Sequence, residues 1–261
     1  MPILSIVVPA YNEEAFIGKL LRAMIAVDTE RLGFSKQIIV VNDGSKDRTS
    51  EIARSFSQVQ VVDQIPNQGR GAAIKRGIAE ATGDYILFQD ADLEYDPKDY
   101  PALLGALRPG EIDCVYGNRL TGIIRDHGRG LFPGKHPQQG VGPWAGALVI
   151  RAWTSLLAMS RVPDMFTGYK LYPAATLKRL RLETNGFELD HEITMKLCRA
   201  RVKFGQVPIS YYPRTVAEGK KIRLSDAFVA LWTVLRYRLK PFAQCIQNIP
   251  EDGRPAVSTK E

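Results

Sequence analysis

Short apolar runs alternate with stretches of helical spacing along the first half of the chain. The runs are rich in Ile, Val, Leu and Phe, as buried parallel strands are, and they occupy residues 4–8, 37–41, 59–62 and 84–88. Apolar residues recur three or four positions apart, which predicts helices, in residues 13–25, 51–56 and 72–81. Asn12 directly precedes the first helix, and we expect its side chain to cap it. The alternation predicts an α/β fold with a doubly wound, mostly parallel sheet flanked by helices.

The second half of the chain continues the pattern with two further strands and two helices. Strands are predicted at 112–116 and 202–209, and a helix begins within 187–192. A last helix is expected over 225–240, and one of its faces carries Phe228, Leu231, Trp232, Leu235 and Leu239. This helix either packs on the core or lies in a membrane interface.

An acidic turn, Gln89–Glu94, follows the strand at 84–88 and gathers three carboxylates. Two carboxylates about 4 Å apart repel by about 4 kcal/mol at an effective dielectric constant of about 20. Such a cluster shifts a pKa or binds a cation. Oxygen ligands suit Mg²⁺ or Mn²⁺, which then bridge to phosphate oxygens. For this motif alone, the alternative is a solvated acidic turn.

Two more polar loops follow predicted strands. Asn42–Ser45 comes after the strand at 37–41, and Asn67–Gly71 opens the helix at 72–81. Each loop alone fits a turn with a helix cap, and the glycine spacing matches neither the Walker A nor the dinucleotide motif. Ligands of parallel sheets bind at the carboxyl ends of the strands, which meet at one edge. Together, the loops and the acidic turn fit a nucleoside diphosphate held by a metal and a cation.

Composition limits the class of protein and its partners. At 261 residues and 45% hydrophobic content, the chain can bury a full core in one or two domains, or in one large α/β domain. The formal net charge of +7 admits nucleic acid, an anionic membrane face or phosphorylated substrates. Nucleic acid is disfavoured because the basic residues are not interleaved with aromatic platforms. We expect no membrane-spanning helix, no secretory signal, and three reduced cysteines in a cytoplasmic protein.

Four segments, in this order, resemble motifs of the family 2 glycosyltransferases of the GT-A fold: Val7–Glu14, Val41–Ser45, Asn67–Gly71 and Asp90–Glu94. Within that family, residues 1–240 are most similar to polyprenyl-phosphate hexose synthases, such as dolichyl-phosphate mannose and glucose synthases. The resemblance implies a single GT-A domain over 1–240 with acceptor-side helices in its C-terminal part. The nucleotide sugar would bind to 1–119 and the acceptor to 120–224; an amphipathic helix (225–240) and a tail (241–261) would follow.

The same resemblance assigns the donor site. It implies that the nucleoside is held by Pro9, Tyr11, Glu13 and Asp43. The diphosphate would lie near Arg70 and near Lys220, which belongs to a basic loop. The metal, Mg²⁺ or Mn²⁺, would bind to the segment formed by Asp90, Ala91, Asp92 and Glu94, with the three acids as ligands. Relatives often carry Gln at the position of Glu94.

On the acceptor side, the resemblance places Arg119 and Arg214 near the transferred phosphates and the segment 164–171 at the sugar. Several relatives carry a second Arg in the helix before that segment. Residues 144–160 offer only Arg151, at a shifted position, so the expected arginine clamp on the acceptor phosphate is incomplete.

A general base is needed for inverting transfer to a hydroxyl, and Asp190 or Glu192 could supply it. The alternative is that these acids only mark the N-terminus of their helix. A phosphomonoester, with a second pKa of about 6, is already mostly ionised at neutral pH and needs no base. The acceptor therefore decides whether either acid takes part in catalysis.

We expect a metal-dependent, inverting glycosyltransferase that moves a hexose from a nucleotide sugar to a polyprenyl or dolichyl phosphate. It would act as a peripheral protein at the cytoplasmic membrane face. One alternative is a family 2 enzyme that acts on a hydroxyl of a glycan or small molecule. The other is a non-catalytic module that binds a nucleotide or a glycan.

Overall fold

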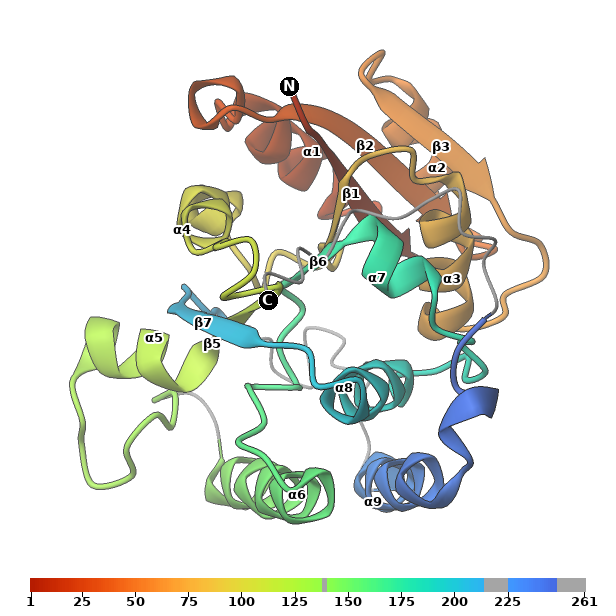
Figure 1. Ribbon diagram of the computed structural model, residues 1–261. Coiled ribbons are helices and arrows are strands. Elements are labelled where there is room, and N and C mark those ends of the chain that lie inside the picture. The colour runs from red at the N-terminus through yellow and green to blue at the C-terminus, as the bar shows by residue number, and fades with distance from the viewer. Residues whose placement is uncertain (138–139, 214–224, 248–261) are drawn as a thin grey trace.

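The computed structural model describes residues 1–137, 140–213 and 225–247. Its centre is a seven-stranded sheet in the order β3-β2-β1-β4-β6-β5-β7 (Figure 1). The strands are β1 (Ile3–Ala10), β2 (Ser35–Asn42), β3 (Val59–Asp63), β4 (Tyr85–Phe88), β5 (Cys114–Asn118), β6 (Lys170–Pro173) and β7 (Phe204–Pro208). Every neighbouring pair is parallel except those of β6, which is antiparallel to both β4 and β5. The predicted mostly parallel sheet is confirmed.

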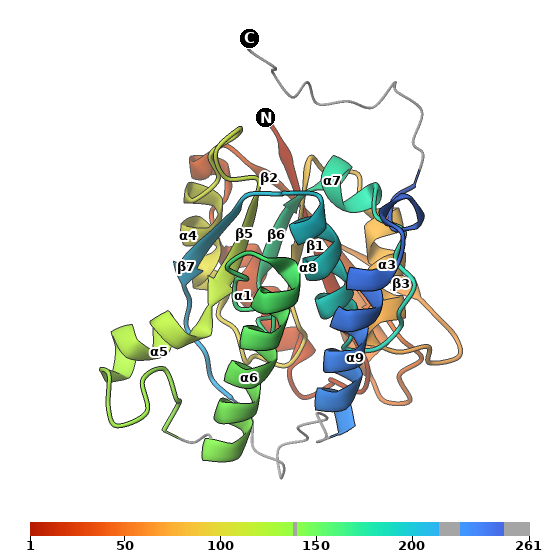
Figure 2. The same cartoon turned by 60° about the horizontal axis from the view of Figure 1, so that its bottom comes forward.

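Helices cover both faces of the sheet (Figures 1 and 2). They are α1 (Ile17–Ala26), α2 (Thr49–Arg54), α3 (Arg70–Glu80), α4 (Tyr100–Gly105), α5 (Arg119–His127), α6 (Val141–Ala158), α7 (Ala174–Lys178), α8 (Leu189–Arg199) and α9 (Ser225–Leu239). Short 3-10 turns occupy η1 (Glu30–Leu32), η2 (Pro97–Asp99) and η4 (Phe242–Gln244). Helices α1 and α4 lie on one face, and α3, α7 and α8 lie on the other.

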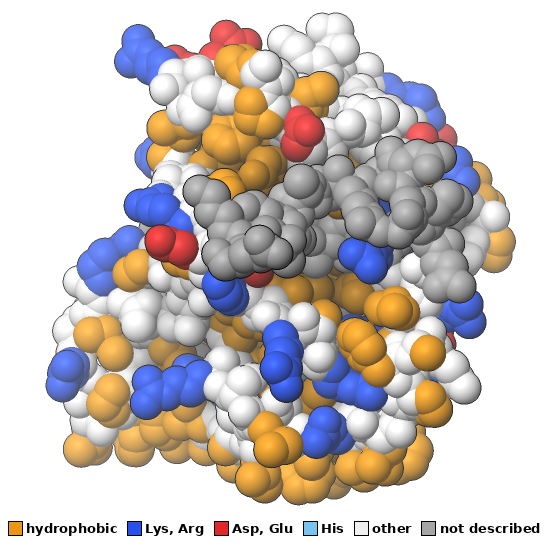
Figure 3. Space-filling model, in the orientation of Figure 1, with side chains coloured by type: hydrophobic (Ala, Val, Ile, Leu, Met, Phe, Trp, Pro, Cys, Tyr) orange, Lys and Arg blue, Asp and Glu red, His pale blue; other side chains and the backbone are white. Residues whose placement is uncertain are grey.

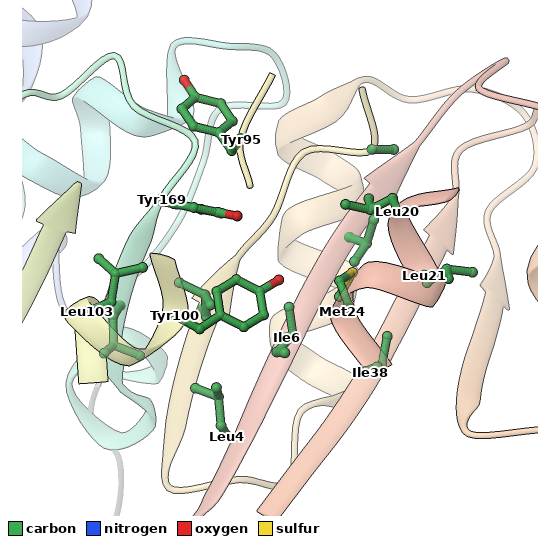
Figure 4. Packing of buried hydrophobic residues seen from close by; sticks show 14 of the residues in the cluster. Leu4, Ile6, Leu20, Leu21, Met24, Ile38, Tyr95, Tyr100, Leu103 and Tyr169 are labelled. Atoms are coloured by element: carbon green, nitrogen blue, oxygen red, sulfur yellow. The ribbon is translucent and has the colours of Figure 1, made fainter. Parts of the chain in front are cut away.

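Strand β1 is an almost unbroken apolar run because both of its faces lie in the core. Leu4 and Ile6 point to the cluster formed with α1 and α4, while Val7 points to the cluster formed with α3 and α8. Figure 4 shows the first cluster, in which Leu20 and Met24 of α1 pack over the strands. A central parallel strand is buried on both faces, so apolar residues are favoured at every position.

Asn12 does not cap the first helix, so that prediction is wrong. Helix α1 begins only at Ile17, and its N-cap residue Phe16 makes no side-chain capping bond. Asn12 adopts a left-handed conformation with φ of 54°, which Asn tolerates better than most residues. Its side chain accepts a bond from the backbone N–H of Lys46, 2.8 Å away, and its own N–H donates to Ser45 Oγ. Asn12 therefore joins the loops that follow β1 and β2.

Helix α9 is present as predicted, and its buried residues lie largely outside the apolar face named from the sequence. Ala230, Val234 and Tyr237 are buried against α6 and α8, whereas Phe228 and Trp232 are exposed. The helix is therefore a packing helix that leaves an apolar face outside. Among the described residues, no helix has both the length and the apolar character needed to cross a membrane.

Candidate active site

A cleft of about 280 Å³ opens at the carboxyl edge of the sheet, where β1, β2 and β4 end. Its lining brings together the expected donor residues Pro9, Tyr11, Glu13, Asp43, Arg70, Asp90, Ala91, Asp92 and Glu94. Arg119 and Asp190 line the same cleft, and Glu192 does not. The predicted contributors Arg214 and Lys220 lie outside the described residues. Phe166, from the segment 164–171 expected at the sugar, also lines the cleft, and three aromatic residues that we did not expect complete the wall: Tyr95, Phe187 and Tyr211.

Asp43 holds the loop that leads into α3. Its carboxylate accepts bonds from the backbone N–H groups of Gln68 and Gly69, each at 2.8 Å. It also accepts from the side-chain amides of Gln64 and Asn67, at 2.7 and 2.9 Å. Gly69 must stay a glycine, because its φ is 100° and a Cβ would lie 2.6 Å from the carbonyl oxygen of Asn185. Asp43 thus shapes the loop before Arg70 as well as lining the cleft.

We expect Asp43→Ala to weaken nucleoside diphosphate binding at least about tenfold, because four bonds to a buried carboxylate are lost and the 67–69 loop is released. Calorimetric titration with UDP and GDP measures this. Asp63→Ala is the matched control, since Asp63 ends the neighbouring strand β3 but does not line the cleft. Unchanged affinity in a folded Asp43→Ala variant would leave Asp43 with a structural role only.

Asp90, Asp92 and Glu94 all line the cleft, and their role as three metal ligands stays a prediction. No group of three or more His, Cys, Asp or Glu side chains within the described parts of the chain is arranged to hold a metal. The turn is tightened by Leu93, whose φ is 58°, and by Asp92, whose carboxylate accepts the N–H of Glu94 at 3.1 Å. Asp90 accepts from Arg70 Nε at 2.8 Å. Two aspartates on one cleft wall still fit a hard cation that takes its other ligands from phosphates.

A chain of alternating charges runs behind the acidic turn. Arg70 contacts Asp90 through Nε and Asp190 through Nη1, at 2.8 and 3.0 Å. The second oxygen of Asp190 lies 3.0 Å from Nζ of Lys170, a fully buried lysine that also donates to the carbonyl oxygen of Thr167. The cations Arg70 and Lys170 and the carboxylates of Asp90 and Asp190 compensate one another in this buried network. The network also fixes Arg70 against Asp90, one of the proposed metal ligands.

The ion pairs of Asp190 argue against its use as a general base. Burial alone would raise the pKa of Asp190, but Arg70 and Lys170 together lower it below its ordinary value. Burial disfavours the charged form of Arg70 as well, but Asp190 and Asp90 raise its pKa. A carboxylate that is ion-paired on both oxygens and has a lowered pKa is a poor proton acceptor. This geometry favours positioning of Arg70 over the general-base role.

Glu192 faces away from the cleft, and its placement does not support a general-base role. The side chain is fully buried and accepts the backbone N–H groups of Glu183 and Thr184, each at 2.9 Å. It also pairs with Lys196 one turn later on α8. These contacts fasten the 183–184 segment to α8.

Arg119, the first residue of α5, lines the cleft and is held by several contacts. Asn118 caps α5 by accepting the N–H of Thr121 at 3.0 Å, which sets Arg119 at the start of the helix. The guanidinium grips Asp164 through Nε and Nη2, at 2.9 and 3.0 Å, and lies over the ring of Tyr211. Burial lowers the pKa of Arg119, but Asp164 raises it well above its ordinary value, so the residue stays charged. A small second cavity adjoins here, lined by Arg119, Tyr211 and side chains of α6.

His191 is a buried neutral residue rather than a ligand in the cleft. Its ring contacts Met165 Sδ and the ring of Phe166, and burial lowers its pKa to about 4. In the unfolded chain, the imidazole has its ordinary pKa of about 6.5. Because the unfolded state binds more protons between these values, the free energy of unfolding falls as pH drops from 6.5 towards 4.

Between pH 6.5 and 4, we expect the free energy of unfolding of the wild type to fall by about 3 kcal/mol more than that of His191→Gln. Urea unfolding at several pH values measures the difference. His127→Gln serves as the control because His127 is an exposed histidine at the end of α5. Equal slopes in the wild type and in His191→Gln would contradict a neutral buried His191.

The fold is of the GT-A type. The chain superposes with a TM-score of 0.67 on the crystal structure of glucosyl-3-phosphoglycerate synthase from Mycobacterium tuberculosis, solved with Mn²⁺, uridine diphosphate and phosphoglyceric acid. The two are 22% identical, and the match covers 92% of this chain and 80% of that chain. More specifically, the chain belongs to glycosyl transferase family 2, whose profile matches residues 5–136.

Curated relatives agree with this family. The chain is 42% identical over 253 residues to a dolichyl-phosphate beta-glucosyltransferase of Trichomonas vaginalis, covering 90% of this chain and 74% of the relative. It is 26% identical to the dolichyl-phosphate beta-glucosyltransferase of Dictyostelium discoideum, covering 84% of this chain and 68% of the relative. A low-salt glycan biosynthesis hexosyltransferase of Haloferax volcanii is 28% identical, with 82% of this chain and 48% of the relative covered. The chain therefore spans about half the length of some relatives that it matches.

Proposed function

We propose that the chain transfers a hexose from a nucleotide sugar to a polyprenyl or dolichyl phosphate, with inversion and with the help of a divalent metal. The observation that carries this proposal is the state of Asp190. Of the two acids expected as a base, Glu192 faces away from the cleft and Asp190 is held by Arg70 and Lys170. An acceptor that is already ionised suits such a cleft better than a hydroxyl, because a phosphomonoester has a second pKa of about 6.

The donor half of the cleft supports binding of a nucleoside diphosphate sugar. The loop fixed by Asp43 and the turn after β1 would hold the nucleoside, and Arg70 would face the diphosphate. Asp90 and Asp92 would hold Mg²⁺ or Mn²⁺ together with diphosphate oxygens. A metal bound there supplies charge neutralisation for the departing diphosphate.

The acceptor half supports binding of a phosphate anion. Arg119 lines the cleft, and Arg214 stays a proposed second contact outside the described residues. In the reaction, an acceptor phosphate oxygen forms a bond to the anomeric carbon. The bond from that carbon to the diphosphate breaks, and the nucleoside diphosphate leaves with the electron pair. Attack on the face opposite the leaving group inverts the anomeric centre.

A panel of nucleotide sugars, assayed with and without a lipid phosphate, tests the proposal directly. A panel of UDP- and GDP-hexoses is incubated with Mg²⁺ or Mn²⁺, with and without a short polyprenyl phosphate, and the release of nucleoside diphosphate is measured. We expect one donor to be used, with release that depends on the lipid phosphate. Release that needs a sugar or glycan hydroxyl instead would replace the lipid acceptor, and binding without release would indicate a non-catalytic module.

A further inference from the structure

Residues 183–186 lie between α7 and α8 in the chain and contact the N-terminal end of α3. The carbonyl oxygen of Asn185 accepts the backbone N–H of Ala72, the third residue of α3, at 3.1 Å. The side-chain oxygen of Asn185 accepts from Nζ of Lys75, one turn further along α3, at 2.6 Å. The first four N–H groups of a helix have no partner inside it, so a carbonyl from a distant segment satisfies one of them here.

A glycine in α3 makes this a contact between two backbones. A Cβ on Gly71 would lie 2.6 Å from the carbonyl carbon of Asn185 and 2.7 Å from the carbonyl oxygen of Gly186. Main-chain atoms cannot turn aside as the end of a flexible side chain can. The position of 183–186 therefore fixes the start of α3, from which Arg70 reaches the cleft.

Glu192 of α8 holds the 183–186 segment from the other side. Its carboxylate accepts the N–H groups of Glu183 and Thr184, each at 2.9 Å, and the hydroxyl of Thr184 at 2.6 Å. Lys196 neutralises this carboxylate, and both side chains are fully buried. Because water does not reach the pair, a lost bond there leaves an unsatisfied polar group.

The C-terminal end of α9 supplies a second anchor. The carboxylate of Glu183 accepts the hydroxyl of Tyr237 at 3.1 Å and pairs with Arg236 and Lys240. Figure 3 shows Lys and Arg side chains spread over the lower part of the molecule, where α8 and α9 lie in Figure 1. Charge-assisted bonds of this kind are the stronger ones. The segment is thus fixed by both α8 and α9 where it approaches α3.

We propose that Glu192 is a positioning residue for the donor site, because through 183–186 it holds Arg70 where a nucleoside diphosphate binds. Two residues of α8 then act on the same arginine: Asp190 through its side chain and Glu192 through the main chain. A displacement of about 1 Å by a change far from the chemistry costs up to about 10²-fold in rate. The inference rests on the proposed donor site and is independent of the lipid acceptor.

Gly71→Ala tests the contact without removing a polar group, and Gly71 does not itself line the cleft. Alanine suits a helix, so α3 keeps its stability while the new Cβ pushes 183–186 away. We expect the Kd for UDP or GDP, whichever binds the wild type, to rise at least about tenfold in calorimetric titration. Gly105→Ala is the matched control, because Gly105 ends α4 and an added Cβ would meet no other segment within 4 Å. We expect it to bind as the wild type does.

Glu192→Gln tests the far end of the same path. The amide nitrogen replaces one of the two oxygens that accept backbone N–H groups of 183–186, so one bond is lost. We expect the KM for the nucleotide sugar to rise about tenfold while the KM for the acceptor stays unchanged. Without nucleotide, exchange of the Ala72 amide with solvent, followed by NMR, should be about tenfold faster. The amide of Ile78, deeper in α3, should exchange at the wild-type rate.

Urea unfolding separates a positioning role from a purely structural one. A purely structural Glu192 would lower the free energy of unfolding in Glu192→Gln and leave the nucleotide affinity of the folded variant unchanged. That outcome would overturn the proposal, even if Gly71→Ala binds more weakly. If Glu192→Gln does not fold, Gly71→Ala decides alone, and an unchanged Kd rejects the proposal. A wild type that binds neither UDP nor GDP would reject the proposed donor site, and the positioning role with it.

Discussion

Asp90→Ala or Asp92→Ala should lower the rate of hexosyl transfer by at least about 10²-fold, because the leaving diphosphate loses its bound counter-charge. Asp90→Ala carries a second penalty, since Arg70 then loses the carboxylate that holds its Nε at 2.8 Å. Nucleoside diphosphate binding should also lose its dependence on Mg²⁺ or Mn²⁺. The measurement is a metal titration of both transfer rate and nucleotide affinity at saturating nucleotide sugar.

Asp96→Ala is the matched control for the acidic turn. Asp96 lies two residues after the turn, but its side chain caps η2 by accepting the N–H of Lys98 at 3.0 Å and does not line the cleft. We expect near-normal transfer from this variant, and a milder loss from Glu94→Gln than from either aspartate variant. Full wild-type turnover in an excess of chelator would contradict the metal requirement.

Arg119→Ala should cost about 2–5 kcal/mol of acceptor or transition-state binding if the acceptor is a phosphate, because a buried charged partner is removed. The effect should appear in kcat/KM for the lipid phosphate at saturating donor. Arg125→Ala controls for the loss of an arginine from α5, since Arg125 is paired with Asp126 on the surface and lies outside the cleft. We expect that variant to stay near the wild type.

Asp190→Asn separates a positioning role from a base. Because Asp190 contacts Arg70 and Lys170, we expect slower transfer with an unchanged pH profile, and Lys170→Met should behave in the same way. A general base would instead cost about 10²–10⁴-fold and remove the acidic limb of the pH profile. That outcome, together with a nearly normal Arg119→Ala, would favour a hydroxyl acceptor.

The strand ends could be predicted from the sequence because their signals are local. The apolar runs that become β1, β2 and β4 each lead into polar residues, and parallel pairing brings those ends to one edge. The short strand β6 gave no such signal, since its four residues, Lys170–Pro173, begin with a lysine and end with a proline. The charge of this buried lysine is compensated by Asp190, which comes from a distant helix.

The roles of the individual site residues could not be predicted, because these roles depend on contacts between distant segments. Arg70 and Asp190 are 120 positions apart, and their pairing turns an expected base into a support for the arginine. Glu192, only two positions after Asp190, points to the other side of α8 and fastens a loop. Asn12 looked like a helix cap until its backbone conformation placed it between two loops.

The lipid product of the reaction tests the central claim most directly. The chain is incubated with the preferred nucleotide sugar, a divalent metal and a short polyprenyl phosphate, and the lipid fraction is analysed by mass spectrometry. The account predicts a polyprenyl phosphate that has gained one hexose through its phosphate, with an anomeric configuration opposite to that of the donor. It also predicts that this product disappears with Asp92→Ala. Nucleoside diphosphate release with an unmodified lipid, or a hexose found only on an added hydroxyl acceptor, would contradict it.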